Sequence, residues 1–324
     1  MRRRRFLGGL ASAWAVWPIA ARAQETSPRV GFVYTGPKSL VASRIEAISR
    51  GLRESGLPAP LQVEFVIRAT DGDPSQIVPL IDEVIGSKVN VFIAVGPAAL
   101  RAARAKSPTI PIVAIDLESE PLEGGIAQSL ARPGGNTTGI FMDFPDFTPK
   151  CLQLLAETST GLSRVAILWD PTIGPVQLDA VKRAASALKV DLDVFEARRS
   201  SDFEKAFSTA DQRSIHAMII LSSPLIPGNV QMLSELALRY RVAAVTLFPD
   251  FARVGGLLAY GPNLLDLIRQ VGVMSGKIIQ GTKPGDLPIE RPTKFELVLN
   301  LKTAKALDLN IAPGLLLRAD EVIE

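Results

Sequence analysis

Short apolar runs alternate with amphipathic segments along the first half of the chain. Most runs have the length of a buried strand and lack the polar alternation of a strand that faces water on one side. The segments between them place apolar side chains three or four residues apart, as in a helix packed on a sheet. The expected strands are 29–34, 61–67, 89–95 and 110–115, and the expected helices are 43–55, 77–85 and 98–106. This order predicts a parallel sheet covered by helices on both faces.

The same pattern restarts near residue 164. The expected strands are 164–169, 190–195, 216–221 and 243–247, with helices at 176–188, 203–211 and 230–240. The tail adds an apolar run at 257–260, a helix at 264–280, a Pro/Gly-rich stretch at 281–292, and a last strand and helix within 295–307. Two arrays of similar length predict an α/β protein with two Rossmann-like, doubly wound lobes rather than one large sheet.

The N-terminus has the three parts of a secretory signal peptide. Four arginines at 2–5 precede a mostly apolar stretch, and Ala21-Arg22-Ala23 follows it. We expect cleavage after Ala23, so that residues 1–23 are removed. The Arg3-Arg4 pair, followed at one residue's distance by Phe6-Leu7, resembles a twin-arginine export signal, and the general secretory route is the alternative.

The charge of the mature chain argues against a nucleic-acid partner. Removal of the five arginines in residues 1–23 lowers Lys plus Arg from 36 to 31, against 33 Asp plus Glu, which leaves a net charge near −2. The basic pI of 9.0 therefore comes from the signal segment and is not evidence for a nucleic-acid partner.

The sequence does not favour catalysis, a metal or a cofactor. One histidine, His216, begins an apolar strand, and one cysteine, Cys151, lies in a helix-like run, so no Ser-His-Asp or Cys-His arrangement is expected. Asp71-Gly72-Asp73 lacks the rest of a calcium loop. The run Gly31 to Ser39 resembles a phosphate-binding loop, but Pro37 intervenes and lacks a backbone N–H.

Ligands of open α/β sheets bind beyond the carboxyl ends of the strands. The helix start at Ala98 would aim free N–H groups at a carboxylate. An acid such as Glu118 could hold an ammonium group, and Trp169 could cover an apolar or aromatic group. The candidate ligand contacts are Tyr34, Thr35, Gly36, Gly96, Pro97, Ala98, Asp116, Glu118, Phe141, Trp169, Asp170, Ser222, Ser223 and Phe248.

Several longer motifs resemble the ABC-transporter substrate-binding family that includes tryptophan- and tyrosine-binding receptors. The motifs are LARPGGNTTG at 130–139, PK at 149–150, GGL at 255–257, YGP at 260–262, PTKFELVLNLKTAK at 292–305 and LLRADEVIE at 316–324. The resemblance covers nearly the whole mature chain. It implies a type I periplasmic-binding-protein fold with a ligand cleft between two lobes.

The same resemblance implies three crossings between the lobes. We place them near 141–143, near 248–250 and within 283–292, so that one lobe comprises 28–141 plus 251–283 and the other 142–250 plus 284–324. Phe141 and Phe248 are cleft candidates because residues at crossings line the cleft.

The implied function is capture of a small molecule by lobe closure. We expect a periplasmic, monomeric solute-binding component of an ABC importer, with permease subunits in the inner membrane as partners. The expected ligand is an amino acid or an aromatic carboxylate. Two other functions remain open: an exported sensory module that reports to a membrane kinase and, less favoured, an α/β enzyme.

Overall fold

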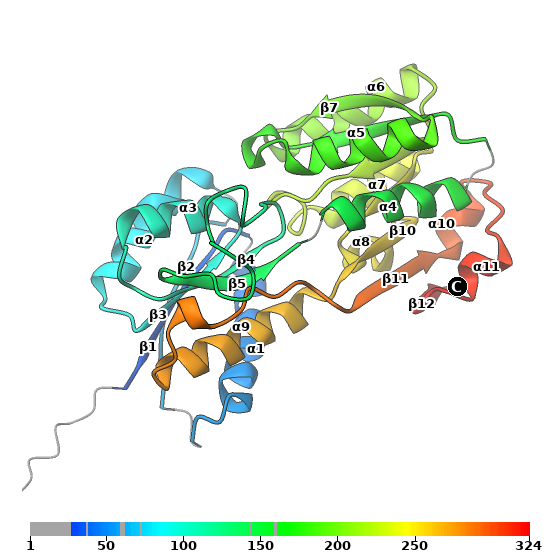
Figure 1. Ribbon diagram of the computed structural model, residues 1–324. Helices are drawn as coiled ribbons and strands as arrows, with labels where there is room; N and C mark the ends of the chain where they lie inside the picture. Colours follow the sequence, from blue (N-terminus) through cyan, green and yellow to red (C-terminus); the bar gives the residue numbers. More distant parts are fainter. Residues whose placement is uncertain (1–26, 37, 59–61, 72, 143, 159–160) are drawn as a thin grey trace, which may run out of the picture.

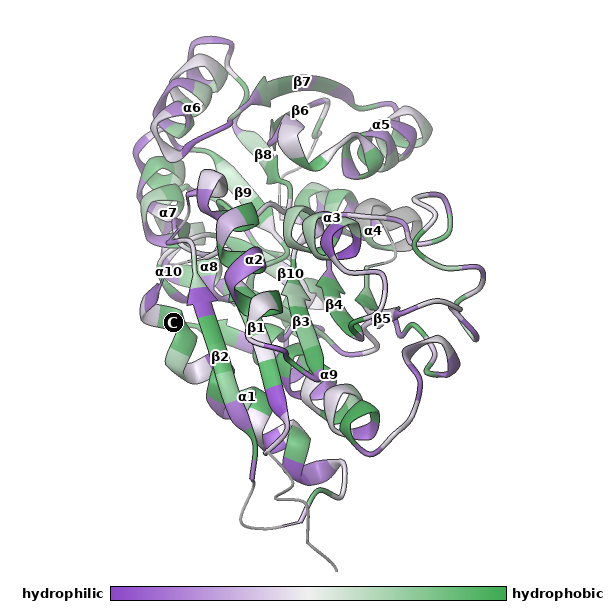
Figure 2. Ribbon diagram, turned by 90° about the vertical axis from the view of Figure 1, so that its left-hand side faces the viewer, coloured by the Kyte–Doolittle hydropathy of each residue, from purple (hydrophilic) through white to green (hydrophobic). Residues whose placement is uncertain are grey.

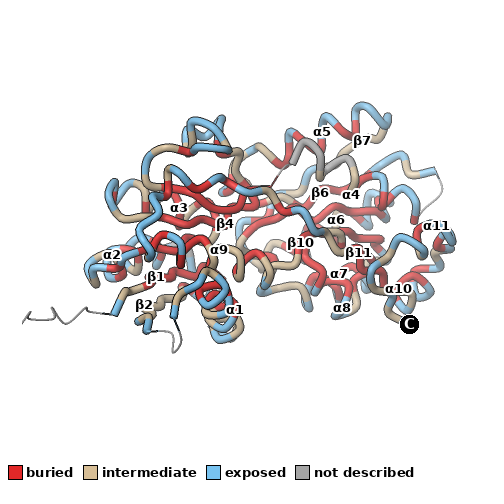
Figure 3. Tube along the Cα trace, turned by 60° about the horizontal axis from the view of Figure 1, so that its bottom comes forward, coloured by how far each residue is buried: buried red, intermediate tan, exposed pale blue. Residues whose placement is uncertain are grey.

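A computed structural model describes residues 27–324 except 37, 59–61, 72, 143 and 159–160. The signal segment 1–23 lies outside the described residues. The chain forms two sheets in separate lobes, shown in Figure 1 with the first sheet at the left and the second at the right. Buried residues concentrate in the strands of both sheets, and exposed residues in the surrounding helices (Figure 3).

The first sheet has the strand order β2-β1-β3-β4-β5, and every pair in it is parallel. The strands are β1 (Arg29–Tyr34), β2 (Glu64–Ala69), β3 (Val91–Val95), β4 (Ile112–Asp116) and β5 (Thr137–Phe141). Figure 2 shows how apolar these strands are. One face packs on α1 (Val41–Glu54) and α9 (Leu264–Ile279), and the other on α2 (Ile77–Gly86) and α3 (Pro97–Lys106). Burial on both faces explains the continuous apolar runs.

The second sheet has the strand order β12-β11-β10-β9-β8-β6-β7. Its strands are β6 (Arg164–Trp169), β7 (Asp191–Glu196), β8 (Ala217–Ile220), β9 (Ala243–Thr246), β10 (Leu258–Pro262), β11 (Phe295–Asn300) and β12 (Glu321–Ile323). Only the β10–β11 pair is antiparallel within this described sheet. The helices are α4 (Phe144–Thr158), α5 (Val176–Leu188), α6 (Phe203–Gln212), α7 (Val230–Arg239), α8 (Pro249–Arg253), α10 (Leu301–Ala306) and α11 (Pro313–Leu316).

The predicted fold class is confirmed: each lobe is a largely parallel sheet with helices on both faces. The strand pairing corrects the predicted lobe boundaries. Because β10 pairs with β9, residues 258–262 belong to the second sheet, although 251–283 was expected in the first lobe. Conversely, Ile289 and Glu290 donate backbone hydrogen bonds to Leu130 (2.7 Å) and Gly139 (2.9 Å), which places this segment beside β5.

The chain therefore crosses between the lobes after β5, at Asn263 and at 291–294. The predicted third crossing overlaps the observed one, and the predicted second crossing at 248–250 does not. The first lobe comprises residues 27–142 and 263–290, and the second comprises 144–262 and 295–324, apart from the gaps given above. Asp143, part of the first predicted crossing, lies outside the described residues.

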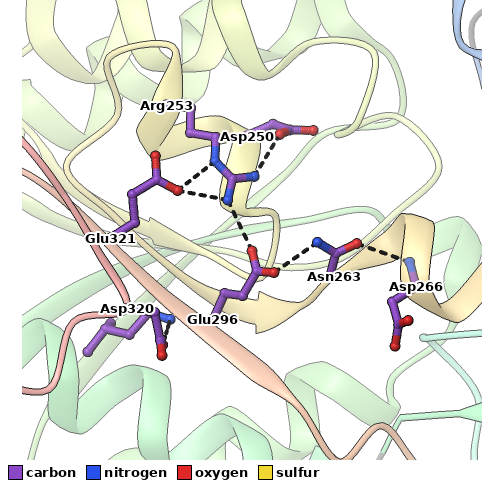
Figure 4. Close-up of polar contacts among 8 residues, drawn as sticks. Asp250, Arg253, Asn263, Asp266, Glu296, Asp320 and Glu321 are labelled. Carbon is purple, nitrogen blue, oxygen red and sulfur yellow. Dashed lines mark hydrogen bonds and ion pairs between the residues drawn. The ribbon is translucent and has the colours of Figure 1, made fainter. Parts of the chain in front are cut away.

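Polar contacts hold the second and third crossings together (Figure 4). The Asn263 amide donates to Glu296 on β11 (2.8 Å), and its oxygen accepts from the backbone N–H of Asp266 (3.0 Å), which caps α9. Glu296 also pairs with Arg253 (3.1 Å), which in turn pairs with Glu321 (2.8 Å). The cap of α9, a helix of the first lobe, is thus joined to β11 of the second sheet.

A candidate ligand-binding cleft between the lobes

The carboxyl ends of the parallel strands of both sheets face one another, and two adjoining pockets lie between them. The first pocket has a volume of about 570 Å³, including space open to solvent. It is lined by Tyr34, Thr35, Gly36, Arg44, Val95, Gly96, Ile115, Leu117, Glu118, Ser223, Pro224, Pro227, Phe248, Leu264 and Ile268. Residues 223–227 and Phe248 come from the second lobe and the others from the first, so the pocket is built by both lobes.

The second pocket has a volume of about 600 Å³ on the same measure. Its lining is Thr35, Thr70, Ile77, Pro97, Ala98, Arg101, Asp170, Thr172, Ile173, Arg198, Pro224 and Leu225. Thr35 and Pro224 line both pockets, so the two form one cleft. The lobes approach closely at this boundary, since a Cβ atom added to Gly96 would lie 3.7 Å from the Pro224 ring.

Local sequence explains how these loops turn toward the cleft. Gly96 has a φ of +84°, a conformation that favours glycine, and it precedes Pro97 at the start of α3. Asp170 accepts hydrogen bonds from the backbone N–H (2.9 Å) and hydroxyl (2.7 Å) of Thr172, which fixes the turn after β6. Backbone conformation and short-range capping thus set the shape of the cleft.

Two buried acids follow β4. Asp116 accepts hydrogen bonds from the backbone N–H groups of Glu118 (3.0 Å) and Ser119 (2.9 Å), and burial raises its pKa. Burial, and then the neighbouring Asp116, raise the pKa of Glu118 to about 8. The Ser222 hydroxyl of the second lobe donates to the Glu118 carboxyl group at 2.5 Å. Glu118 is therefore both a pocket residue and a polar link between the lobes.

Tyr34 and Arg44 form the other polar part of the first pocket. The Tyr34 ring stacks on Phe32 with 5.9 Å between the ring centroids. Burial raises the pKa of Tyr34, and the nearby Arg44 guanidinium opposes that shift. The guanidinium carbon of Arg44 lies 5.8 Å from the centre of the Tyr34 ring.

Most of the residues predicted from strand ends line the cleft. Those in the first pocket are Tyr34, Thr35, Gly36, Gly96, Glu118, Ser223 and Phe248, and those in the second are Thr35, Pro97, Ala98 and Asp170. The remaining four, Asp116, Phe141, Trp169 and Ser222, line neither pocket.

Their positions explain why. Phe141 is fully buried in the core between the first sheet and α2/α3. The Trp169 indole donates to the Gly174 carbonyl (3.2 Å) and packs against the core of the second lobe. It was expected to cover an apolar or aromatic group of the ligand, but it lines neither pocket. Asp116 and Ser222 lie behind Glu118 and position it.

Sequence reasoning missed the cleft residues that lie on helices or in tertiary contact. Arg44 is inside α1 rather than in a strand-end loop. Leu264 and Ile268 come from α9, which begins more than two hundred residues after Arg44 in the sequence. Arg101 of the second pocket lies on α3 and was missed for the same reason. Arg198 lies in the loop directly after β7, and Leu264 follows the end of β10, so the position after a strand end was the signal that could have found these two.

Among the residues that the structure describes, no cluster of three or more His, Cys, Asp or Glu side chains could hold a metal ion. Cys151 is buried, and burial raises the pKa of its thiol. No helix in the described ranges is long and apolar enough to span a bilayer.

Residues 38–323 match the family described as ABC transporter substrate binding protein. The chain belongs to this family. A relative named tyrosine-binding protein, from Clostridioides difficile (strain R20291), is 20% identical over 262 residues, which are 80% of this chain and 75% of the relative.

Solved structures of low sequence identity share the fold. A conserved domain protein from Vibrio cholerae O1 biovar El Tor superposes with a TM-score of 0.83 at 19% identity, covering 91% of this chain and 99% of that one. An ABC domain in complex with L-Trp from Streptococcus pneumoniae gives a TM-score of 0.82 at 18% identity, covering 92% and 100%. The fold is that of the type I periplasmic binding proteins.

Proposed function

We propose that this protein is the solute-binding component of an ABC importer, and that it captures an amino acid or an aromatic carboxylate by closing its lobes. The observation that carries the proposal is the first pocket, which is built by strand ends of both lobes. Its walls are mainly apolar, with a few polar groups that converge on it. Such a site suits a small molecule that has an apolar body and one polar end.

Three further observations support the proposal. Family membership makes substrate binding the shared activity. One relative is named for tyrosine, and one similar structure holds L-Trp. The apolar walls formed by Leu117, Phe248 and Ile268 suit an aromatic or branched side chain.

Ligand binding is tested on purified residues 24–324 by calorimetry and thermal unfolding. The panel contains L-tryptophan, L-tyrosine, L-phenylalanine, L-leucine, phenylacetate and benzoate, with glucose and ribose as compounds outside the proposed class. A ligand at 100 times its Kd stabilises the folded state by about 2.7 kcal/mol, which shifts the Tm measurably. Saturable binding within the class supports the proposal. Binding of the sugars alone, or turnover of a bound compound, would contradict it.

Location in the periplasm is tested by export of the full chain. The arginine-rich start and Ala21-Arg22-Ala23 support a cleaved signal, with a mature protein that begins at Gln24. Changing both Arg3 and Arg4 to Lys should block export by the twin-arginine route. Normal export of that variant would identify the secretory route, whereas retention of the wild-type chain in the cytoplasm would contradict a periplasmic role.

Docking on permease subunits and a monomeric state complete the proposal. Lobe closure alters the surface that both lobes present, which gives a transporter a way to distinguish loaded from empty receptor. Co-purification of the mature protein with ABC permease subunits from the same cells, stronger with bound ligand than without it, tests the first point. Light scattering at the mass of one chain tests the second.

A further inference from the structure

Arg44 is a buried arginine that lines the first pocket. It lies in the first turn of α1, and its exposed fraction is 7%. A guanidinium is always charged at physiological pH, and moving such a charge out of water costs several kcal/mol unless partners compensate it. The contacts of Arg44 therefore show whether the protein itself supplies that compensation.

The protein compensates Arg44 only in part. One terminal nitrogen donates to the Ser43 hydroxyl (3.2 Å), and the guanidinium lies over the Tyr34 ring. Its Nε atom is buried and has no hydrogen-bond partner. No carboxylate in the described part of the chain lies within ion-pair distance of it. Arg269, by contrast, pairs with both Glu54 and Asp266.

We infer that Arg44 is the carboxylate-binding residue of the first pocket. The planar guanidinium matches a carboxylate with two parallel hydrogen bonds, and an incoming anion would supply the missing counter-charge. The ligand's apolar part would then lie along Leu264 and Ile268, which line the same pocket. The inference rests on the proposed function and adds to it the residue that selects for a carboxylate.

The lining of the first pocket makes a strongly anionic ligand unfavourable. A phosphate or a dicarboxylate carries a second negative charge, and the described lining residues include no second Arg or Lys to balance it. A monocarboxylate with an apolar body, with or without an amino group, fits both Arg44, the one arginine among the described lining residues of the first pocket, and the apolar walls. Arg44 therefore narrows the ligand class to monocarboxylates.

The test compares ligands that differ only in the carboxylate. Affinities of L-tryptophan, L-tyrosine and phenylacetate, and of their amides, are measured by calorimetry for wild type, Arg44→Gln and Arg53→Gln. Arg53 is an exposed arginine on the same helix and serves as the matched control. Loss of one partner from a buried, hydrogen-bonded charge pair should weaken binding of the carboxylates at least about thirtyfold.

The amides distinguish an Arg44 that binds the ligand carboxylate from an Arg44 that only stabilises the structure. Wild type should prefer each acid over its amide, and Arg44→Gln should lose that preference because the neutral amide gains nothing from the guanidinium. A merely structural Arg44 would weaken acid and amide equally. Arg53→Gln should behave as wild type.

Arg44→Lys keeps the test usable if the Gln variant does not fold. Lys retains the charge without the two-point geometry, so an intermediate preference for the acids is expected. If wild type binds the panel acids and either Arg44 variant keeps the full preference, the inference about Arg44 is overturned and the proposed function stands. If wild type binds none of the panel, both are overturned.

Discussion

At the scale of single residues, the chemistry of Glu118 depends strongly on its surroundings. It is buried beside a second acid, and both conditions favour the neutral form, so its pKa is raised to about 8. At neutral pH the neutral acid can share a short hydrogen bond with the Ser222 hydroxyl without placing a bare charge between the lobes. An ammonium group bound beside it would favour ionisation, so binding of an amino acid should release protons.

The raised pKa predicts how stability depends on pH. In the folded molecule Glu118 keeps its proton up to about pH 8, whereas its ordinary pKa is 4.5. The folded state therefore holds more protons than the unfolded state between these values, and the free energy of unfolding should fall as pH rises through that window. One such group contributes at most about 1.4 kcal/mol per pH unit. Glu118→Gln, which mimics the neutral acid, should lessen the fall.

The measurement is the Tm of both proteins between pH 5 and pH 9. The Tm of Glu118→Gln should rise relative to the Tm of wild type as pH rises. The variant should keep some pH dependence of its Tm because burial also raises the pKa of Asp116. Glu123→Gln, an exposed position in the same loop, serves as the control and should follow wild type. Parallel curves for wild type and Glu118→Gln would show that Glu118 is ionised in the folded protein at neutral pH.

Residue positions at strand ends were predictable, but the direction of each side chain was not. Parallel strands present their carboxyl ends at one edge, so Tyr34, Glu118 and Ser223 could be assigned to the cleft from the apolar runs alone. Trp169 also ends a strand, yet its side chain turns toward its own lobe and donates to Gly174. That choice depends on packing with residues distant in sequence, which a local pattern does not record.

At the scale of elements, the close contact of α1 and α9 builds one face of the first lobe. A Cβ atom on Gly51 would lie 1.9 Å from the Arg269 carbonyl oxygen, and one on Gly272 would lie 2.5 Å from the Ile48 carbonyl oxygen. The two backbones can approach this closely only because glycine occupies both positions. The contact also holds Leu264 and Ile268, which begin α9, against the first pocket.

Gly272→Ala should therefore separate the two helices. The added methyl group must displace a backbone carbonyl, so we expect a loss of about 1–3 kcal/mol in the free energy of unfolding, the usual cost of overpacking. Urea denaturation measures the change. Gly86→Ala, at the end of α2 with open space around its Cβ, is the control and should be neutral or up to about 1 kcal/mol more stable. Equal stability of Gly272→Ala and wild type would contradict the close packing.

The type of most helices and strands was predictable from the sequence, but which strands pair with one another was not. Apolar runs and helical spacing indicated most strands and helices, because buried parallel strands and amphipathic helices have distinct periods. β5 was missed because its sequence, TTGIF, begins with two threonines and contains a glycine. The antiparallel pairing of β10 with β11 joins segments on either side of α9, so the run at 257–260 could not be assigned to a sheet from its own composition.

At the scale of the whole molecule, the arrangement of the lobes depends on contacts of two kinds. The crossings are held by Asn263, Glu296 and Arg253, which lie outside the pockets. Across the cleft, the Glu118–Ser222 hydrogen bond joins a loop of each lobe. Contacts at crossings persist as the lobes rotate, whereas a bond across the cleft exists only when they are together. If the lobes close as proposed, the second kind of contact stabilises the closed form relative to open ones.

Ser222→Ala removes this bond with little effect on the fold, because Gln177 still holds the backbone N–H (2.9 Å) and carbonyl (2.8 Å) of residue 222. The unliganded variant should populate open forms more than wild type does. Small-angle scattering should then give a larger radius of gyration without ligand and an equal one with saturating ligand. If the closed fraction falls about tenfold, the apparent Kd rises about tenfold, a cost of about 1.4 kcal/mol. Ser208→Ala, which removes a hydroxyl from the outer helix α6, is the matched control. An unchanged radius and affinity in Ser222→Ala would mean that the crossings alone set the lobe arrangement.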